Sequence, residues 1–331
     1  SRQLWWGHRL PVWYKGDEIY CGLTKPEEDG WVQDPDVLDT WFSSWLWPFA
    51  TLGWPEDTDD MKKFYPTQDL VTGPDIIFFW VARMIMAGLY FCKEIPFSNV
   101  YFTGIIRDEQ GRKMSKSLGN SPDPLDLFEK YGADAVRVSI LMIAPQGLDI
   151  LFAEDQLEQG RNFMNKLWNS ARFIIMNLDE EQPEDLSDLA DEKLDAADRW
   201  ILSRLNSIIE EVDGAYIEYK MNEAIKRVYD FTRADFCDWY IEFSKTRFYG
   251  DDGDDRKTAQ TVAVHVMRNI LKLLHPYCPF ITEELWTSFK KPDEKLLITE
   301  SWPLVDSTWI NNDVEQEIQI LMDVISAVRN I

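Results

Sequence analysis

The spacing of hydrophobic residues changes about midway along the chain and separates two kinds of segment. Up to about residue 147, short apolar runs such as residues 99–103 stand between stretches rich in Trp, Pro and Gly, which is typical of strands alternating with helices. From about residue 154, apolar residues recur at three- and four-residue steps, which is the spacing of one helix face. The pattern therefore predicts an α/β segment followed by an all-α helix bundle.

The second segment is expected to hold several long amphipathic helices. Their apolar stripes occupy residues 157–178, 194–212, 225–243, 262–273 and 315–331. The fourth helix is expected to stop at His275-Pro276, with His275 as a helix-end residue, because proline cannot continue a helix. The loops at residues 179–188 and 250–255 are expected to be too acidic and polar to pack.

The change of period predicts a domain boundary near residues 145–153, and so two domains, residues 1–150 and 151–331. The chain begins at Ser1 without an initiator Met or a secretory leader, and its last helix has no stop signal. We therefore interpret it as a piece cut from a longer protein. Arg83 interrupts the longest apolar run, which is judged too short to span a bilayer, so no membrane partner is expected.

Charge and cysteine content exclude only a few classes of function. The formal charge of −24, from 58 acidic against 34 basic residues, has the wrong sign for a general polyanion binder. This evidence is weak, because contacts with phosphate depend on a local basic patch. The four cysteines lie far apart without short paired spacing, which argues against a structural metal site and a disulfide framework. Reduced thiols and a cytoplasmic location are expected.

One short segment carries recognisable chemistry. Residues 111–120 read Gly-Arg-Lys-Met-Ser-Lys-Ser-Leu-Gly-Asn and directly follow a strand-like run. The ammonium groups of Lys113 and Lys116 can stabilise charge on a leaving pyrophosphate, and the serine hydroxyls can donate hydrogen bonds to a triphosphate. On composition alone, a solvated basic turn explains the segment equally well, so the order of the residues has to decide.

That order, over residues 113–117, is the KMSKS signature of class I aminoacyl-tRNA synthetases, and the chain resembles the valyl members of this family. Further matching phrases lie at residues 5–9, 36–48, 70–84, 161–169, 238–242 and 275–280. The resemblance covers nearly the whole chain. It implies the C-terminal part of a Rossmann-like nucleotide-binding catalytic domain, followed by a helical anticodon-binding domain.

The resemblance also implies functional residues. ATP binding is expected at Gly73, Asp75, Lys113, Met114, Ser115, Lys116 and Ser117, with Lys113 and Lys116 catalytic. Asp75 can accept hydrogen bonds from a ribose, and Gly73 lets the backbone come close, although Asp75 fits a helix cap equally well. Trp41 and Trp80 are expected to wall a pocket for a small branched amino acid, with plain core packing as the alternative.

Valine is the implied amino acid, ATP with Mg is implied as a substrate that is not permanently bound, and tRNA(Val) is the implied partner of a monomeric full enzyme. An isoleucyl or leucyl relative and a non-catalytic tRNA-binding scaffold are the alternatives. The family's His-Ile-Gly-His element is absent from the sequence, whose histidines are His8, His265 and His275, and the editing domain is absent too. The segment alone is therefore expected to be inactive.

The expected helix at residues 157–178 offers a candidate RNA surface. One stripe of it holds Asn162, Asn165, Lys166, Asn169, Arg172 and Phe173. Amide hydrogen bonds and aromatic stacking are the usual means of reading single-stranded RNA, so these residues are expected to face the anticodon stem-loop, with Phe173 stacking on a base. Solvated or capping asparagines and a core phenylalanine are the alternatives.

Overall fold

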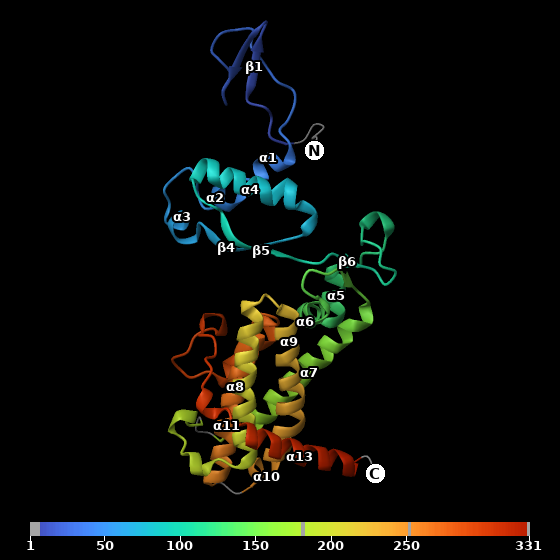
Figure 1. The fold of residues 1–331 in the computed structure, drawn as a ribbon, viewed down its shortest axis with the longest axis vertical. Helices are drawn as coiled ribbons and strands as arrows, with labels where there is room; N and C mark the ends of the chain where they lie inside the picture. The colour runs from blue at the N-terminus through green and yellow to red at the C-terminus, as the bar shows by residue number, and fades with distance from the viewer. Residues whose placement is uncertain (1–6, 180–182, 251–252, 330–331) are drawn as a thin grey trace. The chain divides into compact units, whose positions relative to one another are not determined.

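The structure, a computed structural model, describes residues 7–179, 183–250 and 253–329. The packing divides the chain into two compact units, residues 1–103 and 104–331, and each unit has its own hydrophobic core. The predicted fold class is confirmed, because strands and helices alternate in the first part of the chain and long helices make up the rest (Figure 1). The domain boundary predicted near residue 150 rests on the change of sequence pattern, whereas the division at residues 103 and 104 rests on packing. The predicted boundary stays a prediction.

The first unit opens with a three-stranded antiparallel sheet of order β2-β1-β3. Its strands are β1 (Val12–Lys15), β2 (Glu18–Cys21) and β3 (Val32–Gln33). The indole Nε1 of Trp13 donates to the carbonyl oxygen of Gly22 at 3.0 Å and so ties β1 to the segment after β2. Three short helices follow the sheet, namely α1 (Thr40–Ser44), α2 (Trp47–Ala50) and α3 (Asp59–Phe64).

A parallel strand pair, β4 (Thr67–Thr72) and β5 (Phe97–Phe102), completes the first unit, with Leu70 opposite Val100. Parallel neighbours need a crossover connection, and here it is helical from Pro74 to Cys92. The crossover consists of η1 (Pro74–Ile76), η2 (Ile77–Val81), α4 (Ala82–Ala87) and η3 (Gly88–Cys92). Val81 and Met84 of this crossover pack against Leu70 in the core of the unit.

The crossover corrects one expectation from the sequence. Taken as one helix, Pro74–Cys92 is long and apolar enough to cross a membrane by length and composition, despite Arg83. This criterion is weak, since the core helices of soluble proteins also satisfy it. Arg83 itself is held within the unit, where its Nη1 contacts the carboxylate of Asp39 at 3.1 Å.

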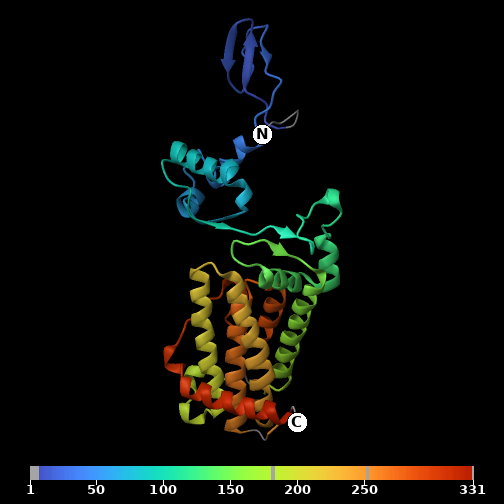
Figure 2. The same ribbon diagram turned by 45° about the vertical axis from the view of Figure 1, so that its right-hand side comes forward.

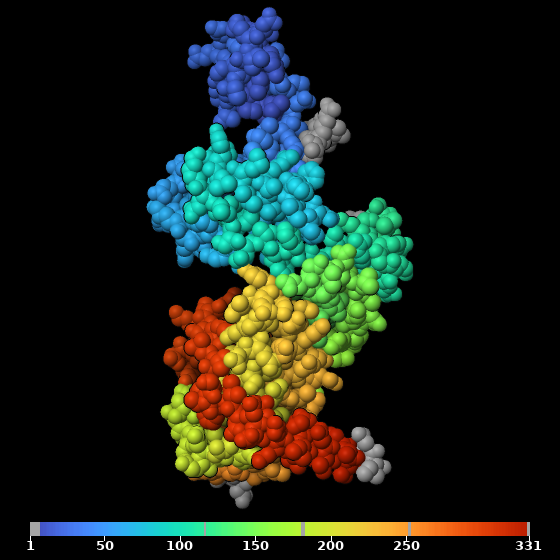
Figure 3. All heavy atoms as spheres, viewed as in Figure 1, coloured from blue at the N-terminus to red at the C-terminus, as the bar shows by residue number. Residues whose placement is uncertain are grey.

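The second unit is dominated by long helices that stand side by side (Figures 1 and 2). Before the bundle come β6 (Ile106–Arg107), η4 (Lys116–Leu118), α5 (Pro124–Tyr131), α6 (Ala133–Ile143), β7 (Ile150–Leu151) and η5 (Glu154–Gln156). The bundle consists of α7 (Leu157–Met176), η6 (Leu186–Asp188), η7 (Asp191–Lys193), α8 (Ala196–Ile217), α9 (Met221–Asp230), η8 (Phe231–Tyr240), α10 (Ile241–Phe248), α11 (Asp254–Leu274), α12 (Pro279–Phe289), η9 (Leu297–Thr299), η10 (Ser307–Trp309) and α13 (Asn312–Arg329). Helical structure is present at all five predicted places, with residues 225–243 divided among α9, η8 and α10, and with residues 330–331 of the last predicted helix outside the described residues. Helix α13 runs across the end of the bundle (Figure 3).

Two details depart from the predicted loops. Leu186 in η6 is buried, so part of the first acidic segment does pack, and Asp254 and Asp255 of the second segment begin α11 as exposed helical residues instead of lying in a loop. Residues 180–182 and 251–252 of these segments lie outside the described residues. The acidic residues Asp254 and Asp255 fit the first turn of α11, because the amide end of a helix favours negative charge.

Helix α6, the second helix after the signature segment, is fixed to the start of α12. Asp134 on α6 accepts hydrogen bonds from the backbone nitrogens of Phe280 at 3.4 Å and Ile281 at 2.7 Å, at the start of α12. Arg137 donates to the carbonyl oxygen of Tyr277 at 3.0 Å. His275 is the C-terminal cap of α11, which confirms its predicted place at a helix end.

Candidate functional site

The signature segment forms a tight hairpin directly after β6. The backbone nitrogen of Asp108 donates to the carbonyl oxygen of Arg112 at 3.0 Å, and that of Gly111 donates to Asp108 at 2.8 Å. Gly111 (φ 77°) and Gly119 (φ 64°) stand at either side of the signature in the left-handed region, where glycine is favoured. An isolated bridge between Arg107 and Lys113 then leads the chain back along β6.

The signature residues divide between core and surface. The side chain of Met114, one of the expected ATP contacts, packs against the core of the second unit, whereas Lys113 and Ser117 are exposed. Ser115 caps the short helix η4, because its Oγ accepts from the backbone nitrogen of Leu118 at 3.3 Å. The backbone of Lys116 lies in η4, and its side chain is outside what the structure describes. The loop is therefore anchored by its methionine and leaves Lys113 and Ser117 exposed, while Ser115 is half-buried.

A buried carboxylate underlies this loop. Asp108 is 8% exposed and accepts hydrogen bonds from the side chain of Asn120 at 2.8 Å and from Nε of Arg112 at 2.8 Å. It also accepts from the backbone nitrogens of Arg112 at 2.8 Å and Gln110 at 3.1 Å. These donors, first among them Asn120, lower the pKa of Asp108 to about 2, so the carboxylate stays charged at neutral pH.

A second ion pair holds the strand that enters the loop. Arg107 Nε donates to Asp149 Oδ2 at 2.5 Å, and Asp149 Oδ1 accepts from the backbone nitrogen of Ile105 at 3.1 Å. The hydrogen bond from Arg107 lowers the pKa of Asp149. Arg107 also donates to the carbonyl oxygen of Gly111 at 3.2 Å. Asp108 and Asp149 were not singled out from the sequence. An Asp followed three residues later by a Gly, as at Asp108 and Gly111, is typical of a tight turn and was the available signal for Asp108.

The other expected ATP and amino-acid residues lie in the first unit. Gly73 caps η1, and Asp75 is exposed in the first turn of η1. Trp80 is half-buried, and its Nε1 donates to the carbonyl oxygen of Ser44 at 2.9 Å. Trp41 is also half-buried and stacks on Phe79 with ring centroids 5.9 Å apart. Both tryptophans therefore lie at the contact between α1 and η2 and are packed on one side.

The six expected RNA-binding residues all lie on α7, but they are not equally accessible. Asn162, Asn165, Asn169 and Arg172 are exposed and share one face of the helix. Lys166 is half-buried and forms an ion pair with Asp238 of η8. Phe173 is half-buried, and its ring meets the buried ring of Phe248 edge-on at 5.4 Å. The structure thus brings four of the six together on the surface.

Sequence reasoning missed an aromatic residue on the same face. The side chain of Trp168 is 43% exposed, and it lies between Asn165 and Arg172 at helical spacing. The signal was available, because positions 165, 168 and 172 fall on one stripe of any helix in this register. Without the packing of α7, however, nothing separated Trp168 from a core tryptophan.

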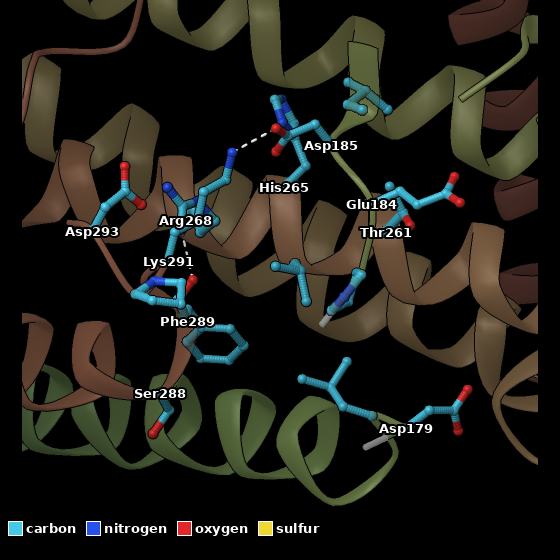
Figure 4. A pocket seen from close by; sticks show the side chains of 15 residues that line it. Asp179, Glu184, Asp185, Thr261, His265, Arg268, Ser288, Phe289, Lys291 and Asp293 are labelled. Atoms are coloured by element: carbon cyan, nitrogen blue, oxygen red, sulfur yellow. Dashed lines mark hydrogen bonds and ion pairs between the residues drawn. The ribbon is translucent and has the colours of Figure 1, made fainter. Parts of the chain in front are cut away.

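A hollow of about 260 Å³ lies in the second unit between the segment before η6, α11 and the end of α12 (Figure 4). Lys291 Nζ contacts Asp185 Oδ2 across it at 2.5 Å, and Arg268 donates to the carbonyl oxygen of Phe289 at 2.6 Å. Burial lowers the pKa of His265, in its wall, to about 4. These pairs join three segments, which favours a structural role for the hollow.

Comparisons with known proteins agree along the whole chain. Residues 22–153 match the family described as tRNA synthetases class I (I, L, M and V), and residues 198–331 match the anticodon-binding domain of tRNA ligase. The full chain is 48% identical to the valine--tRNA ligase of Fusobacterium nucleatum and 50% identical to that of Lactobacillus acidophilus. It spans 39% and 38% of the lengths of these relatives.

Solved structures show the same fold at lower identity. The ternary complex of Agrobacterium radiobacter LeuRS with tRNA and LeuAMS superposes with a TM-score of 0.74 at 20% identity, over 93% of this chain and 42% of that one. The Mycobacterium tuberculosis methionyl-tRNA synthetase complex with methionyl-adenylate gives a TM-score of 0.60 at 22% identity, over 87% of this chain and 60% of that one.

Proposed function

The chain belongs to the valine--tRNA ligases of the class I aminoacyl-tRNA synthetases, and we propose that the protein of which it forms part activates valine with ATP and attaches it to tRNA(Val). The observation that carries this proposal is the identity of 48–50% to valine--tRNA ligases over the whole chain. The intact signature hairpin supports it, because a protein that only bound RNA would not need a loop suited to pyrophosphate chemistry.

In the proposed first step, a carboxylate oxygen of valine attacks the α-phosphorus of ATP, the bond to the β-phosphate breaks, and pyrophosphate leaves with the negative charge. Lys113 and Lys116 stabilise this charge, and the hydroxyls of Ser115 and Ser117 donate hydrogen bonds to the phosphates. Mg enters with ATP. In the second step, a ribose hydroxyl of the tRNA attacks the carbonyl carbon of valyl-adenylate, and AMP leaves. Positioning and charge stabilisation supply most of the rate.

The proposed contacts with the adenosine ribose and with the amino acid involve residues of the first unit. Asp75 and the backbone at Gly73 face the adenosine ribose, and the exposed position of Asp75 on η1 supports this role. Trp41 and Trp80 enclose the valine side chain. Their rings are fixed on one side by Phe79 and by the carbonyl oxygen of Ser44. Rigid indoles favour a small branched group over a longer one.

The exposed face of α7 is proposed to bind the anticodon stem-loop. Asn162, Asn165 and Asn169 supply amide groups, Arg172 supplies positive charge, and Trp168 or Phe173 stacks on a base. The exposed charge of Arg172 beside the asparagine amides supports a local contact with RNA, although the net charge of the protein is −24.

The test is ATP–pyrophosphate exchange by the full-length protein with valine, isoleucine and leucine offered separately. Exchange that depends on valine, followed by charging of tRNA(Val), is the expected result. Exchange that depends on isoleucine or leucine would reassign the amino acid, and tRNA binding without any exchange would identify a scaffold. The 331-residue chain by itself is expected to give no exchange, because its sequence holds no His-Ile-Gly-His element.

A monomeric state and a cytoplasmic location are also proposed. The four free cysteines, Cys21, Cys92, Cys237 and Cys278, support a reducing compartment. Sedimentation of the full-length protein tests the first proposal and cell fractionation tests the second. A dimer in solution, or recovery of the protein outside the cytoplasm, would overturn the respective proposal.

A further inference from the structure

The carboxamide of Asn120 links both sides of the signature hairpin. Its oxygen accepts a hydrogen bond from the backbone nitrogen of Ser115 at 2.9 Å. Its nitrogen donates to Oδ2 of Asp108 at 2.8 Å and lies 3.4 Å from the carbonyl oxygen of Lys113. A single side chain after the signature therefore contacts the backbone of its first and third residues and a buried carboxylate before it.

Asp108 provides the fixed end of this link. It accepts from two backbone nitrogens and from the side chains of Arg112 and Asn120, and it is nearly buried. A carboxylate with this many donors has little freedom to reorient, because a move would break several of these hydrogen bonds at once. The backbone of Lys113 and Ser115 is in this way held through Asn120 to a rigid point.

We propose that Asn120 and Asp108 are positioning residues for the signature loop, and that their hydrogen bond sets where Lys113 and Ser115 meet the phosphates of ATP. The proposal rests on the proposed synthetase function. Neither residue touches the substrate in this scheme. Both act through the backbone of residues that do, so they govern the rate of adenylate formation rather than the affinity for valine.

The chemistry of the pair explains why these two residue types are needed. An asparagine can accept at one atom and donate at the other, which serves the nitrogen of Ser115 and the carboxylate of Asp108 at once. An aspartate at position 120 could still accept from Ser115, but it would place a second carboxylate against Asp108. Two carboxylates at hydrogen-bonding distance repel each other when both are ionised.

The experiment measures valine-dependent ATP–pyrophosphate exchange by the full-length enzyme. In Asn120→Ala, kcat is expected to fall about 10- to 100-fold, since small errors of position at a reacting centre cost rates of this order, while the KM for valine stays unchanged. Asn120→Asp is expected to be slower still. The exchanged pair, Asp108→Asn with Asn120→Asp, restores one donor and one carboxylate and is expected to recover part of the loss.

A matched control lies in the same hairpin. Gln110 contacts the guanidinium of Arg112 at 2.7 Å through its side chain, so Gln110→Ala leaves the bonds of Asn120 in place and is expected to keep full activity. Hydrogen–deuterium exchange gives a readout besides activity. The backbone amide of Ser115 should exchange faster in Asn120→Ala than in the wild type and in Gln110→Ala, because it loses its acceptor.

The outcomes separate this inference from the proposed function. If the wild type shows no valine-dependent exchange, the proposed function fails. If the wild type is active and Asn120→Ala keeps its kcat, the positioning role fails while the function stands. A double variant no faster than Asn120→Asp overturns the pairing of the two residues. Equal loss of activity in Gln110→Ala, with a lower melting temperature in every variant, overturns it in favour of a general structural role.

Discussion

The guanidinium of Arg247 donates to the carboxylate of Asp198 at 2.8 Å, and Asp198 has no exposed surface. Tyr240 donates to the other oxygen of Asp198 at 2.9 Å, and Asp198 forms a capping box with Asp195 at the start of α8. Burial raises the pKa of Asp198, and the positive charge of Arg247 opposes that rise. One buried pair thus joins the first turn of α8 to α10.

Removing Arg247 leaves the carboxylate of Asp198 in the core without its opposite charge. Arg247→Met is expected to lower the free energy of unfolding of the helical unit by about 3–5 kcal/mol, as measured by urea unfolding. Lys245→Met is the control, because its pair with Glu242 is exposed and should be worth less than about 1 kcal/mol. A loss as small as that of the control would refute the importance of the buried pair.

The buried His265 predicts a loss of stability in acid. Its folded-state pKa is lowered to about 4 by burial, whereas an unfolded histidine titrates near 6.5. The unfolded chain therefore takes up a proton first as the pH falls, so stability is present above about pH 6.5 and decreases toward about pH 4, by about 3 kcal/mol at most. Urea midpoints at pH 7.5 and pH 4.5 measure the difference.

His265→Gln is expected to reduce that difference between the two pH values, because glutamine does not titrate. His8→Gln serves as the control, since His8 is exposed in the other unit and its replacement should leave the difference unchanged. An equally large difference in His265→Gln would mean that other groups cause the acid sensitivity.

The signature lysines predict a defect confined to adenylate formation. In the full-length enzyme, Lys116→Ala is expected to lower kcat for pyrophosphate exchange about 100- to 1,000-fold, the effect of removing one preorganised group that stabilises the leaving charge. The KM for valine should change little. Lys130→Ala, which removes an exposed lysine paired with Glu154, is the matched control. Unchanged turnover in Lys116→Ala would exclude its proposed role.

The tryptophan pocket predicts a change of selectivity. Trp80→Ala is expected to enlarge the amino-acid site and to weaken discrimination against isoleucine, because one methylene is worth only about 1–3 kcal/mol. Relative exchange rates with valine and isoleucine measure the effect. Trp13→Ala removes an indole with a similar backbone hydrogen bond in the three-stranded sheet and should leave the ratio unchanged. A fixed ratio in Trp80→Ala would identify Trp80 as core packing only.

The exposed face of α7 predicts separable effects on tRNA binding. Trp168→Ala is expected to weaken binding at low and high salt alike, since stacking on one base is worth about 1–3 kcal/mol. Arg172→Ala should reduce the slope of affinity against salt concentration, because one contact with phosphate is lost. Filter binding at two salt concentrations measures both effects.

Two further variants compare the residues first expected from the sequence. Phe173→Ala should weaken tRNA binding, but the packing of this ring against Phe248 means that its folding must be checked alongside. Lys166→Ala should reduce the salt slope less than Arg172→Ala, because Lys166 is paired with Asp238. Normal affinity and slope in all four folded variants would assign the RNA contact to another helix.

The spacing of apolar residues along the chain was sufficient to predict much of the fold. Apolar spacing located the helices because side chains three and four residues apart share a face whatever the helix packs against. The limits of the loops were less well defined. Leu186 was assigned to an acidic loop, yet it is buried, because its surroundings come from α11 and not from its neighbours in the sequence.

The sequence by itself determined the helices, the α/β segment, the signature residues and, through resemblance, the family. Only the tertiary structure decided which side chains are exposed and which are held by contacts with other residues. It paired Lys166 with Asp238, 72 residues away, left Trp168 exposed and set Phe173 against Phe248. It also folded Asn120 back onto Asp108. The outcomes on α7 depend on contacts with segments far away along the chain, and the contact of Asn120 depends on how the hairpin closes. The spacing of residues within one helix does not encode either of them.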